Sequence, residues 1–386
     1  MGTNVRAAVM VEPGRLEIQE FAWPALADGA ALLKVEMCGI CGTDKHTWRG
    51  ETCQYVGTAA QSNTPFPIIP GHEIVGTLVE INDRQRPRLD FDGAPLGPGD
   101  RVALCPDVVC GECYACRHTF AFPWCEHLRG YGNSFSSTSP PHLLGGWAEY
   151  LYVLPQAFLY RVPSDLPLRV AVMAELMAVS YNLDKVRDFS NLAGEGFATG
   201  CTVVVQGAGP MGICHVIKAR VMGAGTIIAT DLSPFRLARA REFGADYLID
   251  VAGTAPTERL EKVRDLTAGR GADIVVECAG VAEAVPEGLE MVRKGGVYIE
   301  AGNFVDTGAV SINPHRHLCA RNIRLFGMTN HPFTGYTPSL DLLRRYADGF
   351  PFERFVTHEF PLARTEEALL TSMTADSLKV VLAPGT

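Results

Sequence analysis

The sequence predicts an α/β fold in which a doubly wound parallel sheet is inserted into an irregular, mostly β domain. Up to about residue 165, short β-like runs such as AALLKVEM (30–37) and WAEYLYV (147–153) alternate with Pro- and Gly-rich turn signals. From about residue 166, apolar strands alternate with amphipathic helical segments, which is typical of βαβ units and a parallel sheet. After about residue 330 loops return, with helices near PSLDLLRRYADG and RTEEALLTSM and a last strand KVVLAP.

The middle segment supplies the strands of the expected parallel sheet. They are TVVVQGAG, TIIATD, DYLID, ADIVVECAG, GGVYIEAGNF and IRLFGM, in chain order. With 386 residues, the chain is long enough for two cores. We therefore expect residues 166–329 to form a dinucleotide-binding domain, and residues 1–165 with 330–386 to form a second domain.

Composition and charge narrow the class of function. A net charge of -9 offers no basic surface for nucleic acid or an anionic membrane. The N-terminus lacks the pattern of a secretory signal, and no run approaches the ~18 apolar residues of a spanning helix. We expect a cytoplasmic protein that acts on a small molecule. In that reducing compartment the 12 cysteines indicate metal binding for a cluster and core packing for the others.

A glycine motif opens the middle segment. Gly207, Gly209 and Gly212 follow an apolar strand and begin a helix, which is the G-x-G-x-x-G context of a Rossmann pyrophosphate site. Asp231 ends the next strand, where a carboxylate accepts ribose hydrogen bonds and repels a 2′-phosphate, so NAD is favoured over NADP. Arg236 nearby slightly favours NADP; an equal alternative is that it lies over the adenine. Other candidate cofactor contacts are Pro210, Met211, Ala301 and Gly302.

Four cysteines stand close together in CGECYACRHTFAFPWC (110–125). Cys110, Cys113, Cys116 and Cys125 have the spacing C-x2-C-x2-C-x8-C, which suits a closed tetrahedral zinc shell. An iron–sulfur site is the alternative, but the proline-flanked ferredoxin pattern is missing. Because cysteine fills all four positions, this zinc is expected to be structural.

A second ligand set is spread over CGICGTDKH (38–46) and GHEIVG (71–76). Cys41 supplies a thiolate, His72 an imidazole, and either Glu73 or the more distant Glu175 a carboxylate. One Cys, one His and one carboxylate with an open fourth position form a catalytic zinc shell. Thr43, Asp44 and His46 follow Cys41 closely.

The two ligand segments CGICGTDKH and GHEIVG, the segment PGDRV (98–102), the four-cysteine segment and the glycine motif follow one another along the chain. In this order they resemble the motifs of the zinc-dependent medium-chain alcohol dehydrogenases, and the resemblance covers nearly the whole chain. The pattern is most similar to the sorbitol, threonine and butanediol dehydrogenase branch. The resemblance implies a GroES-like catalytic domain, a homodimer or homotetramer, and zinc ligands Cys41, His72 and Glu73 or Glu175. It also implies that Asp44 orients His72, and that Thr43 and His46 relay the proton.

We therefore expect hydride transfer between NAD and a secondary alcohol, diol or polyol, because the residues near the metal are polar. The alternative is a primary or aromatic alcohol, which Trp48 and Tyr55 after the relay histidine would favour. Two other hypotheses are a zinc-free reductase, against which the ligands argue, and a non-catalytic NAD-binding protein. Loops at 53–65, 82–96 and 131–146 have no assigned role.

Overall fold

The computed structural model describes residues 4–85, 87–119, 124–188 and 196–385. The chain divides into two compact units. The first comprises Met1–Glu175, Pro332–Ala347 and Phe352–Thr386, and the second comprises Leu176–His331 and Asp348–Pro351.

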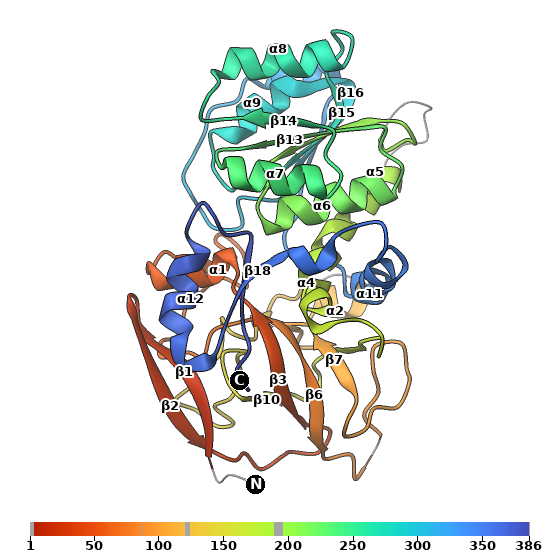
Figure 1. The fold of residues 1–386 in the computed structure, drawn as a ribbon. Coiled ribbons are helices and arrows are strands. Elements are labelled where there is room, and N and C mark those ends of the chain that lie inside the picture. Colours follow the sequence, from red (N-terminus) through yellow and green to blue (C-terminus); the bar gives the residue numbers. More distant parts are fainter. Residues whose placement is uncertain (1–3, 86, 120–123, 189–195, 386) are drawn as a thin grey trace. The chain divides into compact units, whose positions relative to one another are not determined.

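The first unit is built mainly of strands, with short helices at its connections (Figure 1). Its elements are β1 (Asn4–Glu12), β2 (Arg15–Ala22), β3 (Ala31–Gly39), α1 (Gly42–Trp48), β4 (Cys53–Gln54), β5 (Ser62–Asn63), β6 (Glu73–Ile81), β7 (Arg101–Leu104), β8 (Asp107–Val108), α2 (Tyr114–His118), β9 (Arg129–Gly130), β10 (Tyr150–Val153), β11 (Leu159–Arg161), α3 (Leu168–Ala171), α11 (Tyr336–Arg345), β18 (Val356–Phe360), α12 (Thr365–Ser372) and β19 (Lys379–Leu382). Helix α4 (Ala174–Ser180) begins in this unit.

A 7-stranded sheet forms the body of this unit, in the order β11-β7-β6-β3-β19-β18, with β10 also paired to β3. Strands β1 and β2 form a separate antiparallel pair. Strand β3 is apolar along most of its length. Several of its buried residues belong to the main hydrophobic core, which also contains the fully buried Trp147. The last strand, β19, pairs with the end of β3, where Val381 faces Gly39. The C-terminal residues therefore lie beside the end of β3.

The pairing of β3 with β6 brings two distant motifs together. The strands are antiparallel and Gly39, the last residue of β3, faces Glu73, the first residue of β6. The segment that follows β3 and the segment that precedes β6 must therefore meet at the same end of the sheet.

The second unit contains a 6-stranded parallel sheet in the order β14-β13-β12-β15-β16-β17, with helices on both faces (Figure 1). Its elements are α5 (Asp184–Asp188), β12 (Thr202–Gln206), α6 (Pro210–Val221), β13 (Thr226–Asp231), α7 (Pro234–Glu242), β14 (Tyr247–Asp250), α8 (Pro256–Leu266), β15 (Ala272–Glu277), α9 (Ala284–Met291), β16 (Val292–Glu300), α10 (Pro314–His317) and β17 (Arg324–Gly327). This strand order is that of the doubly wound nucleotide-binding fold. The expected fold class is confirmed.

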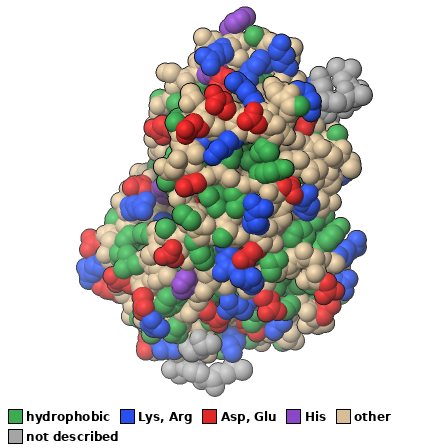
Figure 2. All heavy atoms as spheres, turned by 45° about the horizontal axis from the view of Figure 1, so that its top comes forward, with side chains coloured by type: hydrophobic (Ala, Val, Ile, Leu, Met, Phe, Trp, Pro, Cys, Tyr) green, Lys and Arg blue, Asp and Glu red, His purple; other side chains and the backbone are tan. Residues whose placement is uncertain are grey.

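Acidic and basic side chains of the described residues are interspersed on the face drawn in Figure 2. On that face, charges of the two signs alternate among the described residues. Within the described ranges, no helix has the length and apolar character needed to cross a membrane.

Candidate active site

The end of β3 and the start of β6 hold the expected ligand pair. Cys41 caps the N-terminus of α1, two residues after β3 ends, and His72 directly precedes β6. The ligand atoms of Cys41, His72 and Glu73 lie within 4.8 Å of one another. A thiolate, an imidazole and a carboxylate, separated by about thirty residues in the sequence, are thus close enough to share one metal ion.

Asp44 ties the two segments together from the first turn of α1. Its side chain is buried, and its Oδ2 accepts a hydrogen bond of 2.8 Å from the backbone N–H of Cys41. Its Oδ1 accepts a bond of 3.3 Å from the N–H of Gly71 and lies 3.9 Å from His72 Nδ1. Asp44 therefore contacts the residues around both ligands, as a partner that orients ligand side chains does.

Thr43 and His46 lie on the same short helix. The Thr43 hydroxyl is 3.8 Å from Cys41 Sγ, so it borders the ligand cluster. His46 is about a quarter exposed, and its Nδ1 lies 2.8 Å from a carboxylate oxygen of Glu51. Glu51 itself is about half exposed. His46 is therefore paired with a carboxylate that solvent reaches. Glu51 was not predicted, because no sequence signal points to it beyond its place five residues after His46.

Glu73 is fully buried and has a partner that the sequence reading missed. The Lys379 ammonium contacts both carboxylate oxygens of Glu73 and donates a hydrogen bond of 3.0 Å to the carbonyl of Ile40. Lys379 is itself buried, at the start of the otherwise apolar strand β19. A buried lysine is rare without a partner of opposite charge. The lysine at the start of an otherwise apolar strand is therefore the signal that could have revealed a buried ion pair.

The cluster has a surplus of negative charge. Burial alone lowers the pKa of His72, but the Cys41 thiolate, Asp44 and Glu175 together raise it to about 10. Glu175, in the first turn of α4, acts on this site electrostatically but is not one of the three side chains whose ligand atoms cluster within 4.8 Å. A site that holds a proton so strongly with anionic neighbours suits a divalent cation.

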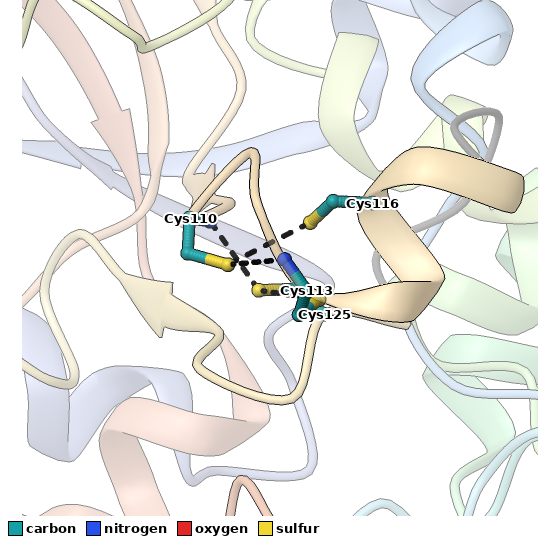
Figure 3. Close-up of side chains that lie close together, drawn as sticks. All are labelled: Cys110, Cys113, Cys116 and Cys125. Atoms are coloured by element: carbon teal, nitrogen blue, oxygen red, sulfur yellow. Dashed lines mark hydrogen bonds between the residues drawn. The ribbon is translucent and has the colours of Figure 1, made fainter.

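The four cysteines of residues 110–125 point towards a common centre (Figure 3). All four sulfur atoms lie within 4.8 Å of one another, and two of the sulfur–sulfur separations are 4.0 Å. A tetrahedral shell with Zn–S bonds of about 2.3 Å holds its sulfur atoms about 3.8 Å apart. This set therefore fits a single zinc ion, and it is too tight to enclose a cluster of several iron and sulfide ions.

Backbone N–H groups support the thiolate form of this lobe. Those of Cys113 and Cys110 donate to the sulfurs of Cys110 and Cys125, at 3.4 and 3.3 Å. Hydrogen bonds from the backbone of Cys116 and Glu126 lower the pKa of Cys113 to about 6. A deprotonated thiol is the form that binds metal, so Cys113 is prepared for an ion. Burial raises the pKa of Cys116 and raises that of Cys125 to about 12, so these two thiols would lose their protons as the ion binds.

The glycine motif forms the turn between β12 and α6. Gly207 has φ +88, and a Cβ there would lie 2.7 Å from the backbone of Ala279, so only glycine fits. A Cβ on Gly212 would come within 1.9 Å of the Gly207 carbonyl. A Cβ on Gly209 meets nothing within 4 Å, so packing does not require glycine there. That open approach to backbone at a helix start is what a pyrophosphate needs.

The other candidate cofactor residues lie at the carboxyl ends of neighbouring strands. Asp231 ends β13 and accepts hydrogen bonds from the N–H groups of Ala208 at 2.7 Å and Ser233 at 2.8 Å. The remaining candidates are Pro210 and Met211 in the first turn of α6, Arg236 in the first turn of α7, and the buried Ala301 and Gly302 directly after β16. They share the edge of a parallel sheet at which nucleotides bind in folds of this kind.

Two family profiles match the chain. The alcohol dehydrogenase GroES-like domain matches residues 27–164, and the zinc-binding dehydrogenase domain matches residues 210–344. The chain is 33% identical over 365 residues to 5-exo-hydroxycamphor dehydrogenase of Pseudomonas putida, covering 94% of each chain. The chain belongs to the zinc-dependent medium-chain alcohol dehydrogenases. It belongs to the sorbitol-type branch, because it matches sorbitol dehydrogenases. That of Ovis aries is 28% identical, over 96% of this chain and 94% of that one.

Other relatives of this dehydrogenase span its full length. Erythritol/L-threitol dehydrogenase of Mycolicibacterium smegmatis is 30% identical and covers 99% of this chain and 98% of its own. A solved alcohol dehydrogenase of Thermotoga maritima is 31% identical, with a TM-score of 0.87 over 99% of this chain and 100% of its own. A zinc-binding dehydrogenase of Sinorhizobium meliloti, solved with NADP bound, is 26% identical, with a TM-score of 0.82 over 99% of this chain and 100% of its own.

The donor sets fit the groups that the family implies. The dehydrogenase presents an all-cysteine set for a structural zinc, a mixed thiolate, imidazole and carboxylate set for a catalytic zinc, and a glycine turn for a nicotinamide dinucleotide. A zinc-free reductase would lack both sets of ligands. The protein is therefore a zinc- and nicotinamide-dependent alcohol dehydrogenase.

Proposed function

We propose that this dehydrogenase transfers hydride from a secondary alcohol, vicinal diol or polyol to NAD, giving the carbonyl compound. The observation that carries the proposal is the number of polar groups around Cys41 and His72. Asp44 and Glu73 are buried beside them, and Glu175 acts on them electrostatically. A polar pocket rejects a substrate without matching hydroxyl groups more strongly than an apolar pocket rejects an extra methylene, because its buried groups would be left unpaired.

The names of the relatives support the same class. Hydroxycamphor carries a secondary alcohol, and erythritol, threitol and sorbitol are polyols. The alternative substrate, a primary or aromatic alcohol, requires Trp48 and Tyr55 to line an apolar channel. Trp48 packs against the core of the first unit, which removes much of that argument.

In the proposed reaction, Cys41 and His72 hold the catalytic zinc with one carboxylate, from Glu73 or Glu175. When bound, zinc stabilises the alkoxide form of the substrate, and the nicotinamide accepts the hydride. Asp44 keeps Cys41 and His72 in place by its hydrogen bonds to the backbone of Cys41 and Gly71.

The chain's own residues must remove the hydroxyl proton. We assign this relay to Thr43, which lies at the ligand cluster, and to His46, which is partly exposed. The Glu51 carboxylate accepts a hydrogen bond of 2.8 Å from His46 Nδ1 and extends the route to solvent. Such a relay lets a proton leave a site from which bulk water is largely excluded.

The preference for NAD over NADP rests on Asp231. Its carboxylate already accepts two backbone hydrogen bonds, which fix its orientation, and its oxygens retain lone pairs for ribose hydroxyls. Its negative charge disfavours a 2′-phosphate.

Oligomerisation and location in the cell are also part of the proposal. We expect a homodimer or homotetramer, because β17 is an edge strand in the described chain and its Leu325 is 46% exposed. All 12 cysteines lie within the described ranges and none forms a disulfide, which suits a reducing cytoplasm. Sedimentation of the zinc-loaded protein tests the first expectation, since a monomer at micromolar concentration would contradict it.

Ranking a panel of alcohols by kcat/KM for NADH formation tests the substrate class. The panel contains sorbitol, threitol, 2,3-butanediol and a bulky secondary alcohol against 1-hexanol and benzyl alcohol. We expect a diol, polyol or secondary alcohol to rank first by at least ~10-fold, about 1.4 kcal/mol in the transition state. If hexanol or benzyl alcohol ranks first by that margin, the argument from polar groups is wrong.

A further inference from the structure

Two carboxyl side chains meet at the edge of the parallel sheet where the cofactor is expected. Glu277 is the last residue of β15 and Glu300 the last residue of its neighbour β16, and the two face each other in the strand register (Figure 1). Glu277 is fully buried and Glu300 is partly buried. The side-chain amide of Asn303 donates to Glu300 Oε1 at 3.0 Å and lies 3.5 Å from Glu277 Oε2, so one group bridges the two carboxyls.

Glu277 also holds the loop that follows β15. Its Oε1 accepts hydrogen bonds from the N–H groups of Ala279 at 2.6 Å and Gly280 at 2.9 Å. The backbone of Ala279 packs against Gly207 of the glycine turn, where a Cβ would lie 2.7 Å from it. A Cβ on Gly302, in the loop after β16, would lie 2.1 Å from Glu277 Oε2. The carboxyl is therefore enclosed by the loops at this edge of the sheet.

The strand order assigns these carboxyls to the nicotinamide half of the expected dinucleotide. In the order β14-β13-β12-β15-β16-β17, the chain progresses outwards in one direction from β12 and in the other direction from β15. A dinucleotide binds across such a switch point, with one nucleotide on each half of the sheet. Asp231, at the end of β13, is the candidate contact of the adenosine ribose. The nicotinamide nucleotide is therefore expected on the half in which Glu277 and Glu300 end their strands.

The pair carries one negative charge at neutral pH. Burial, followed by the charge of Glu300, raises the pKa of Glu277 to about 8, so Glu277 keeps its proton while the partly accessible Glu300 is ionised. The Tyr298 hydroxyl lies 3.5 Å from Glu300 Oε2 and Cys278 follows Glu277, and burial raises the pKa of both. His215 of α6 lies 3.6 Å from Cys278 Sγ, and burial lowers its pKa to about 4. These three groups are neutral at neutral pH, so they do not offset the charge of Glu300.

We infer that Glu277 and Glu300 are positioning residues of the cofactor site, whose negative charge favours the oxidised over the reduced dinucleotide. The oxidised nicotinamide ring is a cation, which a carboxylate at the edge of a protein interior stabilises, whereas the reduced ring is neutral and gains nothing from that charge. Binding of NAD⁺ is thereby tightened relative to binding of NADH. This inference rests on the proposed use of NAD and adds which redox state the second unit prefers.

Titration calorimetry of the zinc-loaded enzyme with NAD⁺, NADH and ADP-ribose tests this, because ADP-ribose lacks the nicotinamide. In the double variant Glu277→Gln/Glu300→Gln, the Kd for NAD⁺ at about pH 7 should rise at least ~3-fold, because the charge is gone. The Kd values for NADH and ADP-ribose should stay close to those of the wild type.

The single variant Glu277→Gln separates charge from structure. It should bind NAD⁺ as the wild type does at about pH 7, where Glu277 is already neutral. At about pH 9 it should bind NAD⁺ more weakly than the wild type, in which Glu277 has then lost its proton. Glu261→Gln, at an exposed position of α8, is the matched control and should bind all three ligands as the wild type does.

Two results for the double variant would overturn the inference: unchanged Kd values for all three ligands, or an equal weakening of all three, which would mean that the pair only supports the loops. If the double variant does not fold, Glu277→Gln still decides, since an affinity for NAD⁺ equal to that of the wild type at about pH 9 would overturn the inference as well. A wild type that binds neither NAD⁺ nor NADH would instead refute the proposed function.

Discussion

Cys41, His72 and Asp44 show what local spacing can predict and what it cannot. Cys41 and His72 were predicted as ligands from their residue types and neighbours, and the structure brings their side-chain donor atoms together. Lys379 was missed because it stands 306 residues from Glu73, and no local pattern links them. The sequence left open whether Glu73 or Glu175 would complete the shell, and the structure places Glu73 with Cys41 and His72.

Asp231 is predicted to set the cofactor preference. In Asp231→Ser the ratio of kcat/KM for NAD to that for NADP should fall by at least ~10-fold, because the acceptor for the ribose and the repulsion of a 2′-phosphate are both lost. The matched control is Asp250→Ser, since Asp250 faces Asp231 at the end of the neighbouring strand. An unchanged ratio in Asp231→Ser would mean that another residue reads the ribose.

The buried Glu277 and its partly buried neighbour Glu300 give the second unit a predicted pH dependence. Glu277 and Glu300 face each other at the ends of β15 and β16, and burial followed by the charge of Glu300 raises the pKa of Glu277 to about 8. The folded protein therefore binds a proton that the unfolded chain, with an ordinary pKa near 4.5, releases. The resulting stability is present below about pH 4.5 and is lost as the pH rises through about 8.

Glu277→Gln should flatten this dependence. Urea unfolding of wild type and variant between about pH 5 and pH 8 should show the wild type losing roughly 2 kcal/mol more than the variant. Glu261→Gln, at an exposed position of α8, is the control and should follow the wild type. If the free energy of unfolding changes with pH in the same way in Glu277→Gln and in the wild type, Glu277 does not take up a proton on folding and the prediction is wrong.

At the scale of elements, the strands of the parallel sheet were predictable because such strands are buried on both faces and read as apolar runs. Strands β8 and β9 have two residues each, too few for any pattern. The charged loop at 82–96 gave no sign that Arg88 is buried, where it donates to the carbonyls of Gly29, Pro155 and Ala157. That loop is fixed by long-range hydrogen bonds, which a sequence pattern does not carry.

The four-cysteine lobe is predicted to stabilise rather than to react. Cys113→Ser should bind one zinc fewer and melt at least about 5 °C lower, which corresponds to about 2 kcal/mol, because metal binding there is folding free energy. Cys319→Ser, which alters an exposed cysteine, is the control. Unchanged zinc content and melting temperature in Cys113→Ser would contradict the structural site.

For the whole molecule, the fold class could be predicted because the sequence pattern changes along the chain. Short β-like runs give way to alternating strands and helices, and loops return near the C-terminal end. The expected domain boundaries near residues 165 and 330 stay predictions. The family assignment joins the two candidate ligand sets and the glycine turn into one enzyme, whose residues would hold zinc as a Lewis acid for the alcohol and a nicotinamide dinucleotide as the hydride acceptor. That account depends most on Cys41, because the proposed chemistry requires a metal at that thiolate.

Zinc content and alcohol-dependent NADH formation, measured together in wild type, Cys41→Ser and the control Cys53→Ser, test this most directly. The account predicts two zinc ions per chain and activity in wild type and Cys53→Ser. It predicts one zinc in Cys41→Ser, with activity lower by at least about 1000-fold, since the Lewis acid that stabilises the alkoxide is gone. Equal zinc content in wild type and Cys41→Ser, or activity that survives the loss of that zinc, would contradict it.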